Sequence, residues 1–177
     1  MISKQMTKAL NEQIMKELYS AYLYQSMAAY SAGNNMRGSA SWFQIQALEE
    51  IFHAEKFYNY IIDQGESVEL HPIDKPPKDF KSVLDLFEQT LAHEKTVTAS
   101  INSLVTLSQK ENDNASFIFL QWFVTEQIEE EATPAEIIGR LKFAGTDGSG
   151  LFMMDAELGT RVYTPPIGKR NFKLFLA

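Results

Sequence analysis

Acidic side chains interrupt the apolar stripes of this sequence. Between residues 10 and 28, apolar residues recur at steps of three and four, which is the spacing of a helix face that packs into a core. Glu17 lies in the middle of that stripe, and Glu94 lies in the middle of a similar stripe between residues 84 and 105. Two further stripes contain Glu50, His53, Gln127 and Glu130.

Each of these side chains alone has an ordinary interpretation. A single glutamate on a helix is usually solvated, and a single histidine on an apolar face is more often a hydrogen-bonded core residue than a metal ligand. Together they are costly, because burying an ionised carboxylate without a partner costs several kcal/mol. No lysine or arginine lies on these stripes. A multivalent cation would satisfy all of the groups at once, so the stripes predict a metal site.

The polar positions repeat along the chain at fixed intervals. The interval from Glu17 to Glu50 equals the interval from Glu94 to Gln127. One constant shift along the sequence relates four pairs, which are Glu17 and Glu94, Glu50 and Gln127, His53 and Glu130, and Glu49 and Glu126. The sequence therefore predicts two helical hairpins whose four helices bring these groups to one level.

The predicted ligands are rich in oxygen, with one imidazole and no thiolate, because the sequence has no cysteine. This set excludes structural zinc of the usual kind and copper(I), and it favours iron or manganese over magnesium and calcium. Glu50 and His53 share a helix face at i, i+3, so one metal can take both together with Glu17. Glu94 and Glu130 would lie opposite, and Glu50 could bridge two metals.

The second hairpin departs from a symmetric di-iron centre. Such a centre has a glutamate from each of two helices and Glu-x-x-His from each of the other two. The second hairpin carries Gln127-x-x-Glu130 instead, so one metal position lacks a histidine and a bridging carboxylate. We expect this position to hold its ion more weakly, which suits an ion that passes through.

Glycine and proline divide the chain into four long helical stretches and a short one. The first is expected at about residues 3–32, and the second follows the turn at 33–35 and ends near Ile62. The third is expected at 82–110, with Ser82 as its N-cap. The fourth and the short fifth are expected at 114–143 and 151–158. The proline-rich connection after Gly65 is expected to be extended and to reach along the bundle. The predicted fold class is all-α, a ferritin-like four-helix bundle with one long crossover plus a short C-terminal fifth helix. Pro134 predicts a kink in the fourth helix.

Composition narrows the protein class further. The chain has 177 residues, of which 45% are hydrophobic, so we expect one domain with a sizeable core. A net charge of −7 argues against a nucleic-acid partner. No secretion signal or membrane-length apolar run is visible, so we predict no membrane association and a cytoplasmic location, which the lack of cysteine weakly favours.

Four segments resemble non-haem bacterial ferritin: NEQIMKELYSAYLYQSMAAY, ALEEIFHAEKFYNYI, HEKTVTASI and FLQWFVTEQIEEEA. The likeness extends from about Ile2 to Gly159. It implies a cage of 24 subunits that oxidises Fe²⁺ with dioxygen or peroxide and stores the iron as a ferric oxide mineral. It also implies a di-iron centre without haem, because haem-binding relatives carry Glu-x-x-His in both hairpins.

The resemblance assigns roles to individual residues. The first iron would be bound by Glu17, Glu50 and His53, and the second by Glu50, Glu94 and Glu130 with Gln127 beside it. A third, adjacent iron site would use Glu49, Glu126, Glu129 and Glu130. Tyr24 matches the family's tyrosine near the centre, for which a redox role is implied; a core tyrosine with a satisfied hydroxyl is the alternative.

Two questions stay open at this point. Residues 1–159 form the expected ferritin-like di-iron domain, whereas the tail at 160–177 is basic and extends beyond the resemblance. We predict an irregular tail and favour disorder over a docking peptide for the inner wall of the cage or for a shell protein. The alternative function is a non-storing di-metal oxidase or peroxide scavenger. A purely structural bundle would have apolar residues at the predicted ligand positions.

Overall fold

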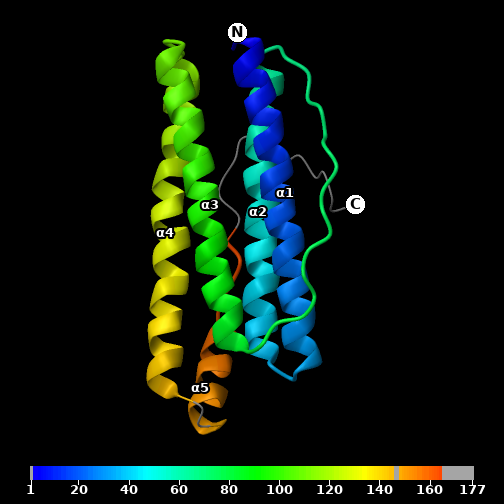
Figure 1. Ribbon diagram of the computed structural model, residues 1–177, viewed down its shortest axis with the longest axis vertical. Coiled ribbons are helices and arrows are strands. Elements are labelled where there is room, and N and C mark those ends of the chain that lie inside the picture. The colour runs from blue at the N-terminus through cyan, green and yellow to red at the C-terminus, as the bar shows by residue number, and fades with distance from the viewer. Residues whose placement is uncertain (1, 146–147, 165–177) are drawn as a thin grey trace.

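A computed structural model describes residues 2–145 and 148–164. Five helices follow each other along the chain: α1 (Lys4–Gly33), α2 (Arg37–Asp63), α3 (Val83–Lys110), α4 (Asn114–Ala144) and α5 (Gly148–Leu158). α1 packs on α2, α3 packs on α4, and α5 packs against α2 and α4 at one end of the bundle (Figure 1). The arrangement confirms the predicted four-helix bundle with a short fifth helix, which begins at Gly148 rather than at the expected Leu151.

The two hairpin turns are built alike. Asn35 follows α1 with a φ of 61°, and Asn112 follows α3 with a φ of 55°. Few residue types adopt this left-handed region readily, and asparagine is one of them. The interval between the two asparagines is the same shift that relates the polar positions. The repeat therefore extends from the helices to the turns that join them.

Short polar side chains begin three of the long helices. Ser3 accepts a hydrogen bond from the backbone N–H of Met6, and Asp113 accepts one from Ser116. Ser82 accepts one from the N–H of Asp85, which confirms the predicted N-cap of α3. Each contact satisfies a backbone donor that has no partner inside the first turn of a helix.

The long crossover between α2 and α3 runs along the bundle beside α1 (Figure 1). Asn11 holds one end of it: the side-chain oxygen accepts from the N–H of Glu69 at 2.8 Å. Further along, the hydroxyl of Ser26 donates to the carbonyl oxygen of Pro77 at 2.5 Å. The connection contains no helix or strand, as its prolines predict.

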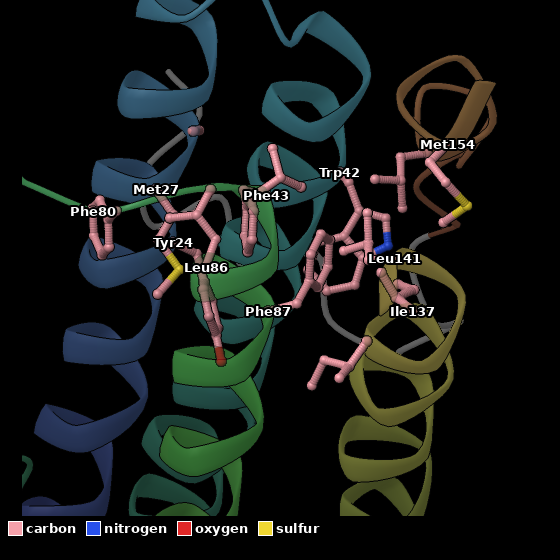
Figure 2. Packing of buried hydrophobic residues seen from close by; sticks show 14 of the residues in the cluster. Tyr24, Met27, Trp42, Phe43, Phe80, Leu86, Phe87, Ile137, Leu141 and Met154 are labelled. Atoms are coloured by element: carbon pink, nitrogen blue, oxygen red, sulfur yellow. The ribbon is translucent and has the colours of Figure 1, made fainter. Parts of the chain in front are cut away.

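Two apolar clusters fill the bundle, one on each side of the polar level. The cluster near α5 includes Tyr24, Phe43 and Phe87 (Figure 2). The cluster at the opposite end includes Leu10 and Phe57 among its members. Along each helix the polar stripe members fall between these two clusters. The groups that could bind a metal are therefore held in an apolar surrounding, where an uncompensated charge is expensive.

A carboxylate from α5 takes the place of a cap on α2. Met36, at the N-cap position of α2, makes no side-chain capping bond. Instead, Asp155 accepts from the N–H of Gly38 at 2.9 Å and from the N–H of Ser39 at 2.7 Å. A Cβ at Gly38 would lie 1.6 Å from the carbonyl oxygen of Asp155. Glycine is thus required at this point for α5 to dock.

Two further predictions concern α4 and the tail. α4 is helical through Pro134 up to Ala144, so the proline does not break it, and the predicted kink stays a prediction. Residues 161–164 are irregular, as expected, but Arg161 is held by contacts that the favoured disorder would not give. The rest of the tail, 165–177, lies outside the described residues. Among the described helices, none is both long and apolar enough to span a membrane.

Candidate metal centre

Six polar side chains from the two hairpins are buried at one level of the bundle. They are Glu17, Glu50, His53, Glu94, Gln127 and Glu130, and each is at most 8% exposed. Each of the four long helices supplies at least one of them. The sequence repeat thus brings both sets of polar residues into one buried layer.

The first donor group comes from α1 and α2. One ligand atom each of Glu17, Glu50 and His53 lies within 4.8 Å of the other two, which is close enough to hold one ion. His53 Nδ1 lies 3.3 Å from Glu50 Oε2. Gln13 donates to Glu17 Oε1 at 2.8 Å, but no hydrogen-bond donor in the described part of the chain reaches Glu17 Oε2. A buried carboxylate oxygen without a donor is the feature that a cation would satisfy.

The second donor group shares Glu50 with the first. Ligand atoms of Glu50, Glu94 and Glu130 also lie within 4.8 Å of one another. Here the protein itself supplies hydrogen bonds to the carboxylates. The Tyr24 hydroxyl donates to Glu94 Oε1, and Gln127 Nε2 lies 3.3 Å from Glu94 Oε2. Because one carboxylate belongs to both groups, two ions held here would be bridged by Glu50.

Hydrogen bonds from the neighbouring helices complete this half of the site. Gln46 Nε2 donates to Glu130 Oε2 at 2.5 Å and lies 3.4 Å from Glu50 Oε1. Gln127 Nε2 also lies within reach of the hydroxyl of Thr98, at 3.1 Å. A cation in the second group would have to replace some of these bonds, whereas in the first group it would meet a free oxygen.

Burial raises the pKa of the carboxyl groups at this level. Loss of hydration, reinforced by nearby carboxylates, raises the pKa of Glu17 to about 8 and that of Glu130 to about 8. For Glu94, burial raises the pKa to about 7, and hydrogen bonds from Tyr24 and Gln127 offset part of the effect. Burial and the neighbouring acids also raise the pKa of Glu50 well above its usual range. Without a cation, protons therefore neutralise the layer near neutral pH.

Tyr24 lies between the layer and the apolar cluster near α5. Its ring stacks on Phe43 with centroids 6.2 Å apart, and its hydroxyl contacts Glu94. Burial, followed by the charge of Glu94, raises the pKa of the phenol well above its usual range. Tyr24 is therefore a neutral donor that faces the second group.

A third set of acids leads from the layer toward the surface. Ligand atoms of His53, Glu126 and Glu130 lie within 4.8 Å of one another. Glu49 and Glu129 line a small cavity of about 40 Å³ together with Glu126 and Glu130. Glu129 is exposed. The four acids predicted for a third site thus share one cavity.

Three residues at the site escaped the sequence reasoning. Gln13 and Gln46 each lie one helical turn before a stripe glutamate and are separated by the same interval as Glu17 and Glu50, so the spacing within the first hairpin contained a signal for both. Arg161 is the third, because its Nη2 lies 2.5 Å from Glu49 Oε2. The stripes themselves contain no lysine or arginine. Arg161, which follows α5, nevertheless brings a positive charge to the acids of the small cavity.

Comparisons with known proteins agree with this architecture. The ferritin-like domain family matches residues 7–144, which include both hairpins. A bacterial non-heme ferritin of Campylobacter jejuni is 43% identical over 155 residues, covering 88% of this chain and 93% of that protein. Another, from Staphylococcus aureus, is 39% identical over 163 residues, covering 92% of this chain and 98% of that protein.

Solved structures give the same result. An open-pore ferritin from the hyperthermophilic archaeon Archaeoglobus fulgidus superposes with a TM-score of 0.91 at 41% identity, covering 92% of this chain and 100% of that chain. A humanized archaeal ferritin superposes with a TM-score of 0.92, also at 41% identity, covering 93% of this chain and 100% of that chain. Sequence, helix order and backbone geometry agree over nearly the whole length, and the chain belongs to the ferritin family.

Proposed function

We propose that this protein stores iron. It oxidises Fe²⁺ with dioxygen at a pair of adjacent sites and deposits the Fe³⁺ as a ferric oxide mineral inside a cage of 24 copies. Family membership supports iron storage in general. The single observation that carries the ferroxidase part is Glu50, which belongs to two buried donor groups at once.

The two donor groups fit a pair of iron ions. The first ion is held by Glu17, Glu50 and His53, and it meets the oxygen of Glu17 that has no donor. The second ion is held by Glu50, Glu94 and Glu130. Carboxylate oxygens with one imidazole are ligands that suit iron, and a shared carboxylate keeps the two ions close.

The electrons balance with two ions. Each Fe²⁺ gives up one electron, and one dioxygen molecule accepts both electrons with two protons to form hydrogen peroxide. The protein supplies position and negative charge, while the redox chemistry belongs to the metal. Fe²⁺ binding displaces the protons that the raised pKa values of Glu17 and Glu130 keep on the carboxyl groups near neutral pH. The hydrogen bond from Tyr24 to Glu94, a proposed ligand of the second ion, supports a role for the phenol beside that ion.

The outer acids provide a path for the product. Glu126 and Glu130 share a donor group with His53, and Glu49 and Glu129 continue the line of oxygens. Ferric ions would leave the second group along these residues, because it holds its ion less firmly than the first. A third iron ion can bind transiently to these residues on its way out.

One experiment tests the proposal and its alternative. The purified protein is sized by light scattering and then titrated in air with ferrous salt while the absorbance of ferric iron is followed. An assembly of about 24 subunits that takes up iron far beyond two ions per subunit supports storage. A dimer that oxidises only a stoichiometric amount of iron, or that consumes peroxide without retaining iron, would establish the non-storing alternative.

A further inference from the structure

Arg161 is held by three contacts on one face of α2. Its Nη1 donates to Gln46 Oε1 at 2.8 Å, and its Nη2 donates to Glu49 Oε2 at 2.5 Å. The guanidinium carbon lies 4.6 Å from the centre of the Trp42 ring. Trp42, Gln46 and Glu49 follow one another at steps of four and three, so they form a continuous strip on the helix. A planar guanidinium matches such a strip by stacking and by directed hydrogen bonds.

The position of Arg161 is set by the docking of α5. Asp155 anchors α5 on the first turn of α2, and the N–H of Gly159 returns to the carbonyl oxygen of Asp155 at 3.1 Å. The N–H of Arg161 lies 3.4 Å from the carbonyl oxygen of Leu158, the last residue of α5. Arg161 therefore reaches Glu49 directly from a fixed helix end, and little chain freedom is lost on contact.

The contacts of Arg161 continue into the buried layer. Gln46 accepts from Arg161 through its oxygen and donates to Glu130 through its nitrogen, at 2.5 Å. Arg161 thus fixes which end of the Gln46 amide points to Glu130. At the same time it neutralises Glu49, an acid of the small cavity that Glu126 and Glu129 also line. The cavity already contains a positive charge before any metal enters it.

We propose that Arg161 is a built-in cation that competes with the third iron for Glu49 and so limits each subunit to two tightly bound ions. The inference rests on the proposed function, because it concerns cation traffic at the same centre. A third ion must displace the guanidinium from Glu49, because two positive charges on one carboxylate repel each other. Arg161 is accordingly a specificity-determining residue that prevents the third position from holding an ion tightly.

The test counts cations rather than turnover. Zn²⁺, which does not change its oxidation state, is titrated calorimetrically into the assembled full-length protein and its variants. We expect two ions per subunit for the unchanged protein at low concentration and three for Arg161→Gln, with the third about 10-fold tighter than in the unchanged protein. Arg161→Lys keeps the charge but loses the planar fork, so we expect an intermediate affinity. Glu49→Gln should weaken the third ion in every background.

A matched control and a structural readout complete the design. Lys142→Gln removes another cation paired with a glutamate, Glu88, at an exposed contact between α4 and α3 that does not involve α5, and it should behave as the unchanged protein. Crystals of the unchanged protein at saturating Zn²⁺ should show Arg161 displaced from Glu49 wherever the third ion is bound. This structure tests whether Arg161 competes with the third ion even if Arg161→Gln fails to assemble.

The outcomes separate the two claims. Equal third-ion affinity in the unchanged protein and Arg161→Gln, or a third ion bound to Glu49 with Arg161 still in place, would overturn the role of Arg161. Absence of ions from the donor groups of Glu17 and Glu94 in all variants would instead overturn the proposed function.

Discussion

The two halves of the buried layer have the same register but differ in how their carboxylates are satisfied. In the first half, Gln13 bonds one oxygen of Glu17, and no donor within the described ranges reaches the other. In the second half, Tyr24 and Gln127 both contact Glu94. One half therefore leaves a ligand free for an ion, whereas the other already holds its ligands with protein hydrogen bonds.

This difference gives a physical reason for unequal affinity. Sequence alone suggested a weaker second ion because Gln127-x-x-Glu130 lacks a histidine. The hydrogen bonds add a second cause, since an ion that enters the second group must first displace bonds that are worth about 0.5–1.5 kcal/mol each to a neutral acceptor and about 1.5–3 kcal/mol each to a charged one. A pair of sites with unequal affinity can hold one ion while it releases the other.

A change of pH should have the largest effect on both stability and cation affinity, because protons and metal ions compete for the same carboxyl groups. Burial raises the pKa of Glu17 from 4.5 to about 8, so the metal-free folded chain binds more protons than the unfolded chain between these values. The free energy of unfolding of the metal-free protein therefore falls as pH rises from 4.5 to 8. Cation affinity changes the opposite way, by about 10-fold per pH unit for each displaced proton.

Calorimetry with Zn²⁺ and thermal unfolding with a chelator, both between about pH 5 and pH 7.5, check these slopes. A metal-free protein whose melting temperature rises across this range would contradict the account, because the carboxyl groups would then be ionised without a cation.

Glu17→Gln tests the first half directly. The change keeps the shape and removes the charge, and we expect affinity for the first ion to fall by about 100-fold or more, since even the loss of an outer partner of a metal ligand costs about 10- to 100-fold. Calorimetric titration with Zn²⁺ measures it. Glu12→Gln, on the exposed face of the same helix, is the matched control and should change nothing. Equal affinities in both variants would remove Glu17 from the ligand set.

Gln127→Glu should make the two halves more alike. A carboxylate in place of the amide adds a charged ligand beside Glu94, and we expect the second ion to bind about 10-fold more tightly, as ligand charge governs affinity for hard cations. The metal-free protein should melt at a lower temperature, because a donor to Glu94 is replaced by a like charge. Gln121→Glu changes an exposed position of the same helix and serves as the control. A second ion that binds no more tightly would show that hydrogen bonding, and not ligand charge, sets the difference.

Tyr24→Phe should have the smallest effect on ion binding, but it should lower the stability of the metal-free protein. Removal of the hydroxyl leaves Glu94 with one donor fewer, at a cost of about 1–3 kcal/mol, which lowers the melting temperature by several degrees. The second ion should bind equally well or slightly better, because it displaces one bond fewer. Tyr22→Phe, at an exposed tyrosine of the same helix, is the control for thermal unfolding and titration. If both variants melt alike, the bond to Glu94 contributes nothing.

The sequence predicted the features that depend on spacing within a helix. Apolar periodicity and the position of the prolines predicted the four-helix bundle and its long crossover. The constant shift between the two hairpins predicted the six residues of the buried layer. The spacing within the first hairpin also pointed to Gln13 and Gln46, each one helical turn before a stripe glutamate, although their role was not predicted. Arg161 could not be predicted, because its place depends on Asp155 meeting Gly38, a contact between residues far apart in the sequence. Local pattern carries no information about such a contact.

The crossover has a practical consequence, because it joins two halves of the layer without contributing to either. It is attached to α1 at Asn11 and at Ser26, and between these points the chain has no helix or strand. A cut there would give two fragments, one with Glu17 and His53 and the other with Glu94 and Glu130. Neither fragment could complete a bridged pair alone, so bound iron would favour the association of the two fragments. Reassembly of such a split protein would therefore depend on the metal concentration.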